Sequence, residues 1–132
     1  MRKKKYQQLI SGTDNAFKLA KKYDLLFGFG TDSQGNPALA ERQGAQLAKL
    51  VRYFEPWEVL KIATSQNYQI MKRSGPRDPY PGENGVVKEG AYADLLLVDG
   101  NPLEDINLIA DPHKNFVIIM KDGVIYKNSI NK

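Results

Sequence analysis

Cysteine is absent from the sequence, and histidine occurs once in 132 residues, at His113. Without cysteine the chain can form no disulfide, thiolate metal site or cysteine nucleophile. With one histidine it cannot by itself form a site that needs two imidazole ligands, such as the HExxH and three-histidine zinc sites. Apolar runs are also short, and none approaches the roughly 18 residues of a membrane span. Several common catalytic centres are thereby excluded.

The 132 residues suit a single domain, and 42% hydrophobic with 26% charged residues is typical of a soluble globular chain. The net charge of +4 comes from 19 Lys and Arg against 15 Asp and Glu. Residues 2–5 supply four of these cations, so this basic start is either a solvated end or a phosphate-binding arm. Because no RNA-binding motif accompanies it and polar residues interrupt any signal-peptide core, we expect a cytoplasmic protein with no nucleic-acid or membrane partner.

The first half of the chain shows helical spacing on both sides of one apolar run. Thr13 or Asp14 can cap a short helix that Asp24 ends. The run 25–30 (LLFGFG) is apolar on both faces, which is typical of a buried parallel strand. Further helices are expected over residues 39–53, from Glu55-Pro56 onward, and over residues 67–73.

The second half reads as short strands after a loop rich in proline and glycine. Strands are expected over residues 86–87, 93–98, 116–121 and 124–126. Asp122-Gly123, between the last two, predicts a two-residue hairpin turn. The predicted division is a basic flexible start (1–12), a helix-strand-helix segment (13–74), a loop (75–84) and β-strands (85–132).

Asp32 is the strongest candidate for chemistry, because it follows the apolar run 25–30 within Thr31-Asp32-Ser33. Functional residues gather at the C-terminal ends of strands in parallel α/β folds. A carboxylate there can ligate a metal ion or accept a proton from water, and the hydroxyls of Thr31 and Ser33 can hydrogen-bond it. The alternative is an Asp that caps the loop or the next helix.

The remaining candidates favour structural roles. His113 lies in a predicted turn without a second histidine, so it is expected on the surface. Trp57, near the start of the third helix, is expected in the core. The glycines at 28 and 30 lack the third glycine of a dinucleotide fingerprint. Turn formation and capping are expected of four acidic residues, Asp94, Asp99, Glu104 and Asp105.

Four segments, in the family's order, resemble the C-terminal part of the metal-dependent amidohydrolase superfamily. Residues 18–33 (KLAKKYDLLFGFGTDS) resemble the last helix–strand step of its barrel, and residues 56–64 (PWEVLKIAT) resemble the next helix. Residues 85–106, with Gly-x-x-x-x-Gly-x-x-Ala-Asp-Leu and Gly-Asn-Pro-Leu, resemble the exit into a small β-sandwich, and residues 117–127 its closing hairpin. Within the superfamily the likeness is to imidazolonepropionase-related and Xaa-Pro dipeptidase-like members.

This resemblance implies an α/β fold, in which the last helix-strand-helix portion of a TIM-type barrel precedes the C-terminal strands of a small β-sandwich. It implies that Asp32 ligates a divalent metal, zinc or a similar ion, and takes the proton of the attacking water. The implied reaction is hydrolysis of amide, peptide-like or other C–N bonds. Asp94, in the Ala-Asp-Leu segment, is implied to be structural.

The chain also departs from the family. The other metal ligands, a His-x-His pair, a carboxylated Lys or a Glu, and two further His, lie on earlier strands, and His113 matches none of them. Since a zinc site needs three or four protein ligands, we expect no tightly bound metal in this chain alone. Residues 67–73 replace the small and apolar residues that the family has there.

Two hypotheses follow. In the first, the chain is a C-terminal amidohydrolase fragment, inactive alone, and a complementary N-terminal amidohydrolase chain supplies the missing ligands. In the second, it is a non-catalytic module that reuses the fold and forms a homo-oligomer through the apolar faces that a partial barrel leaves uncovered.

Overall fold

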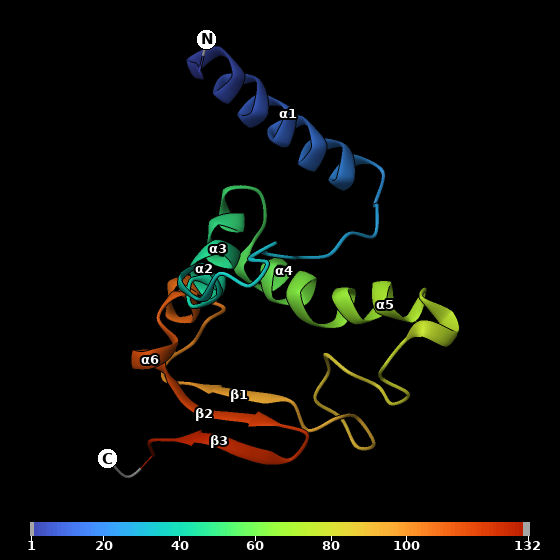
Figure 1. The fold of residues 1–132 in the computed structure, drawn as a ribbon, viewed down its shortest axis with the longest axis vertical. Helices are drawn as coiled ribbons and strands as arrows, with labels where there is room; N and C mark the ends of the chain where they lie inside the picture. The colour runs from blue at the N-terminus through green and yellow to red at the C-terminus, as the bar shows by residue number, and fades with distance from the viewer. Residues whose placement is uncertain (1, 131–132) are drawn as a thin grey trace.

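A computed structural model describes residues 2–130 as a mainly helical first half followed by a small antiparallel sheet (Figure 1). The first half contains α1 (Arg2–Lys22), α2 (Pro37–Ala40), α3 (Gln43–Ala48), η1 (Lys49–Arg52), α4 (Pro56–Lys61), η2 (Ile62–Gln66) and α5 (Asn67–Lys72). The second half contains η3 (Gly75–Arg77), β1 (Leu95–Val98), η4 (Ile106–Ala110), α6 (Pro112–Asn115), β2 (Phe116–Lys121) and β3 (Val124–Asn128). Met1 and residues 131–132, which the predicted division places in the flexible start and the sandwich strands, lie outside the described residues.

Helix α1 begins at Arg2, so the helix start predicted at Thr13 or Asp14 is wrong, while the flexibility predicted for residues 1–12 stays a prediction. The hydroxyl of Ser11 donates to Gln7 O (2.9 Å) and that of Thr13 to Leu9 O (2.9 Å). Both hydroxyl groups therefore donate to backbone carbonyl oxygens inside the helix, and neither side chain caps its start. The first half of α1 projects away from the rest of the molecule (Figure 1).

The strand predicted over residues 25–30 is also wrong, because these residues form an extended segment that belongs to no sheet. A strand is defined by hydrogen bonds to a neighbouring strand, and the part of the chain that the structure describes places none beside this segment. We call residues 25–30 the extended segment. The barrel portion and the sandwich implied by the resemblance remain predictions.

Helices around the extended segment follow local signals in part. Helix α4 begins as expected, with Pro56 in its first turn and a capping box between Glu55 and Glu58. It continues through the π-helical η2 into α5, which confirms the short helix predicted near residue 67. The single helix predicted over 39–53 is instead divided into α2, α3 and η1.

The sheet has the order β1-β2-β3 with antiparallel pairing, in which Leu96 faces Ile119. Asp122 and Gly123 both have positive φ, of 51° and 76°, which confirms the predicted hairpin turn. Strand β2 has the predicted bounds. The strand predicted at residues 86–87 is not formed.

The core lies where α3, α4 and η4 meet, and its buried residues are Ala48, Phe54, Val59, Ile62, Ile106 and Ile109. Phe17 of α1 and Phe27 of the extended segment pack edge-to-face against each other, with ring centroids 5.9 Å apart, and both contact Phe54. The prediction that Trp57 lies in the core is wrong: its side chain is 54% exposed and, with Phe54, lines a cavity of about 390 Å³ that opens to solvent. Among the described residues, no helix has the length and apolar character needed to span a membrane.

Asp94 ties β1 to the hairpin turn, as a structural residue would. Its carboxylate accepts hydrogen bonds from Asp122 N (2.6 Å) and Lys121 Nζ (3.2 Å), and these contacts hold the pKa of the Asp94 carboxyl below its ordinary value. A lowered pKa in the folded chain means that this contact stabilises the fold above the unfolded pKa. The contribution is lost as pH falls through the folded pKa.

Replacing Asp94 by Asn is therefore expected to lower the melting temperature at pH 7. The variant should also lose less stability than the wild type when the pH is lowered below about 4, the ordinary carboxyl range. Thermal melts followed by circular dichroism between pH 2 and 7 measure both effects. Asp99→Asn is the matched control, because among the described residues the Asp99 side chain makes no hydrogen bond or ion pair. Parallel pH profiles for Asp94→Asn and the wild type would contradict the prediction.

Candidate functional site

Asp32 is exposed and lies in a loop, two residues after the extended segment ends at Gly30 and just before the turn at residues 34–35. Its φ is 50°, in the left-handed region that Asp and Asn enter more readily than most residues. Within residues 2–130 its carboxylate has no hydrogen-bond or ion-pair partner. The expected bonds from Thr31 and Ser33 to Asp32 are absent there, because these two hydroxyls bond each other instead (3.3 Å). The carboxylate is thus open to solvent and to a ligand.

The extended segment is held against the helices at two points. On one side Phe27 packs on Phe17 and Phe54. On the other, the side-chain amide of Asn67 bonds both backbone groups of Phe29: Phe29 N donates to Oδ1 (2.9 Å), and Nδ2 donates to Phe29 O (3.0 Å). These contacts place the chain just before Asp32. The sequence carries no local sign of the Asn67 contact, because its partner lies 38 positions away.

The described residues do not by themselves fit a zinc ion. No three His, Cys, Asp or Glu side chains lie close enough together among them to hold a metal. His113 is exposed on α6, as expected, in a different element from Asp32. One carboxylate is a weak donor set for an ion that takes three or four protein ligands. Any metal site that includes Asp32 needs donors from outside these residues.

Two of the other acidic candidates have the expected structural roles. Asp105 caps η4 by accepting from Asn107 N (2.9 Å). Glu104 accepts from Asn101 Nδ2 (2.9 Å) in the preceding turn. Among the described residues, neither side chain forms a metal-binding group with Asp32.

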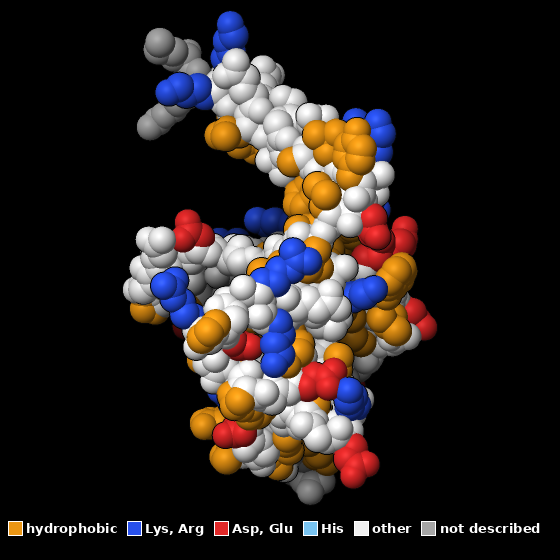
Figure 2. Space-filling view, turned by 90° about the vertical axis from the view of Figure 1, so that its right-hand side faces the viewer, with side chains coloured by type: hydrophobic (Ala, Val, Ile, Leu, Met, Phe, Trp, Pro, Cys, Tyr) orange, Lys and Arg blue, Asp and Glu red, His pale blue; other side chains and the backbone are white. Residues whose placement is uncertain are grey.

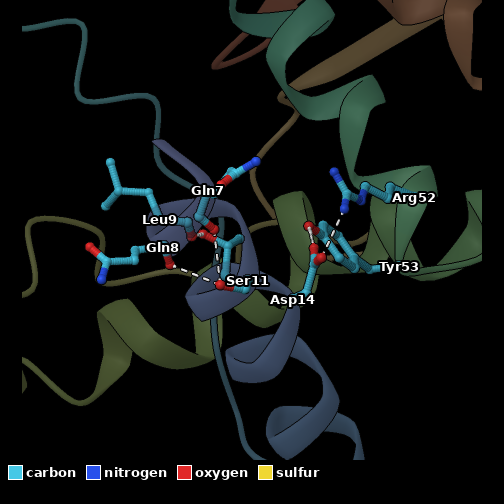
Figure 3. A network of polar contacts seen from close by, with 8 residues as sticks. Gln7, Gln8, Leu9, Ser11, Asp14, Arg52 and Tyr53 are labelled. Atoms are coloured by element: carbon cyan, nitrogen blue, oxygen red, sulfur yellow. Dashed lines mark hydrogen bonds and ion pairs between the residues drawn. The ribbon is translucent and has the colours of Figure 1, made fainter. Parts of the chain in front are cut away.

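Asp14 anchors α1 to the body through a polar network that the sequence did not indicate (Figure 3). Its carboxylate accepts from Arg52 Nη2 (2.9 Å) and from the hydroxyl of Tyr53, and the bond to Asp14 raises the pKa of that hydroxyl. Beyond this anchor, Tyr6 and Leu9 are 66% and 70% exposed. Figure 2 shows the first half of α1 standing clear of the body, with basic side chains, drawn in blue, near its end.

Comparison with known proteins identifies a family to which the chain is similar over nearly its whole length. The profile of the amidohydrolase family matches residues 3–128. Ochratoxinase of Aspergillus niger is 31% identical over 124 residues, which make up 93% of this chain and 24% of ochratoxinase. The chain therefore spans about a quarter of the length of that curated relative.

Solved structures agree with this match. The crystal structure of A. niger ochratoxinase has a TM-score of 0.74 and 28% identity, covering 92% of this chain and 26% of that one. An amidohydrolase has a TM-score of 0.73 and 28% identity, covering 89% of this chain and 26% of that one. A prolidase complexed with N-methylphosphonate-L-proline has a TM-score of 0.71 and 27% identity, covering 87% and 26%.

Proposed function

Since the chain belongs to the amidohydrolase family, we propose that it forms the C-terminal part of a metal-dependent hydrolase of amide or related C–N bonds, with Asp32 as its contribution to the active site. The observation that carries the proposal is the Asp32 carboxylate, exposed and unpartnered among the described residues. It lies in the Gly-Thr-Asp sequence to which the resemblance assigns the metal-ligating Asp.

In this proposal Asp32 accepts the proton of the water that attacks the amide carbon. An exposed carboxylate on an anchored segment can act as a general base if the water is held within hydrogen-bond reach. The other groups that hold and activate this water come from a complementary N-terminal amidohydrolase portion. We propose that the 132-residue chain alone therefore has no hydrolase activity.

A direct test compares the chain alone with a chimera. In the chimera, residues 3–128 replace the matching quarter of A. niger ochratoxinase. Both proteins are assayed with an ochratoxin and with a dipeptide that ends in proline, the compounds suggested by the names of the relatives. The chimera should hydrolyse at least one of them and contain bound zinc or a similar metal by elemental analysis. Stoichiometric, tightly bound metal together with turnover in the isolated chain would contradict the proposal that the other active-site groups come from an N-terminal portion.

Self-association of the isolated chain is a separate prediction. Leu25 at the start of the extended segment is 54% exposed and Val87 is 86% exposed, so apolar surface is available for a second copy. Light scattering of the chain over a hundredfold range of concentration should then show a mass above 14.9 kDa that rises with concentration. A monomer mass at the highest concentration would contradict it.

A further inference from the structure

From the contacts between the extended segment and α5, we infer that Asn67 is a positioning residue that fixes where Asp32 stands. The inference rests on the proposed function, because it concerns the placement of the same carboxylate. It goes beyond that function by assigning a role to a side chain of the helix behind the segment.

The Asn67 amide acts on Phe29 as a neighbouring strand would. In a parallel sheet, one strand bonds both the N–H and the C=O of a given residue on its neighbour. Asn67 does the same with Oδ1 and Nδ2, and Nδ2 also donates to Ala63 O (3.3 Å) within its own helix. Within the described structure, Phe29 has hydrogen-bonded backbone groups, whereas the other residues of 26–30 have none. The Asn67 amide is thus the polar anchor of this stretch.

Gly28 provides the space that this anchor needs. A Cβ atom at position 28 would collide with Asn67 Oδ1 and would lie 2.9 Å from Ile70 Cδ1. A glycine is therefore required for the amide to reach Phe29. Asn67 also directly follows the π-helical turn η2, a kind of helix irregularity found often at functional sites.

Phe29, the residue that the Asn67 amide holds, lies three residues before Asp32. Because the Asp32 carboxylate makes no hydrogen bond within the described residues, its position depends on the backbone that leads to it. Phe29 is the last residue before Asp32 whose backbone is hydrogen-bonded to another element. The bond between Thr31 and Ser33 is local and joins only side chains. A misplacement of a reacting group by about 1 Å can lower a rate by about 100-fold, so such an anchor has catalytic value.

Two substitutions test the anchor from opposite sides in the full chain. Asn67→Leu removes both bonds while keeping a side chain of similar size, and Gly28→Ala displaces the amide without altering it. For both variants we expect the Phe29 amide to exchange with solvent at least about tenfold faster, measured by NMR, because its hydrogen bond is lost. The Asp32 Cα and Cβ resonances should shift with it. Gly30→Ala is the matched control, since a Cβ there meets nothing within 4 Å.

Unchanged exchange of Phe29 in both folded variants would overturn the inference, and so would faster exchange with unchanged Asp32 resonances. In the chimera, Asn67→Leu should lower kcat by about 10- to 100-fold while KM stays within about twofold, since it misplaces a reacting group. If Asp32→Asn leaves kcat of the chimera unchanged, the proposed function fails. The NMR measurements on the isolated chain still decide whether Asn67 positions Asp32.

Discussion

Asp32→Asn is expected to lower kcat of the chimera by about 100- to 10,000-fold, the usual contribution of a positioned general base. Asn keeps the size of the side chain and tolerates the positive φ of 50° at this position. It cannot accept a proton or carry the negative charge. Because Asp32 makes no hydrogen bond or ion pair among the described residues, the substitution removes no observed contact, and the melting temperature should stay the same.

Asp24→Asn provides the matched control for this experiment. Asp24 lies at the other end of the extended segment, is exposed, and also has a positive φ, of 46°. The two substitutions therefore change charge and backbone preference in the same way at the two ends of one segment. Steady-state kinetics with the better chimera substrate should show the loss for Asp32→Asn alone. Equal kcat values for the two variants would exclude Asp32 as the proton acceptor.

Features fixed by neighbouring residues were predictable from the sequence. The Asp122-Gly123 turn depends on two residues that can both take positive φ, and the start of α4 depends on Glu55-Pro56 and Glu58 within one turn. The family resemblance was confirmed as well, since it rests on motifs spread along the chain. Asp32 was identified as a candidate from its place in Gly-Thr-Asp.

Features that depend on distant partners were not predictable. The apolar run 25–30 has the composition of a strand, yet a strand also needs a neighbour, and Asn67 bonds its backbone instead. The predicted start of the first helix is wrong because neither predicted cap acts as one: Thr13 bonds Leu9 O within the helix, and Asp14 bonds Arg52 and Tyr53. The sequence shows that residues 67–73 depart from the family pattern, but it gives no local sign that Asn67 bonds Phe29, since the two residues are 38 positions apart.

Gly44→Ala is expected to destabilise the fold by about 2 kcal/mol, although alanine is the better helix former by about 1 kcal/mol. Gly44 lies in α3, where a Cβ would collide with the backbone carbonyl of Ile109 in η4. Ile109 is buried at 6% exposure, so neither backbone can move without disturbing the core. This contact joins the helical half to the half that contains the sheet, and the melting temperature should fall by about 5–10 °C.

Gly12→Ala separates the steric effect from helix propensity. Gly12 also lies inside a helix, α1, but a Cβ there meets nothing within 4 Å. The same substitution should therefore stabilise the chain slightly, by up to about 1 kcal/mol, or leave the melting temperature unchanged if this part of α1 unfolds before the core. Opposite signs for the two variants in thermal melts would show that close packing of α3 on η4, with no room for a side chain at position 44, holds the two halves together. A melting temperature for Gly44→Ala equal to that of the wild type would contradict this account of the core.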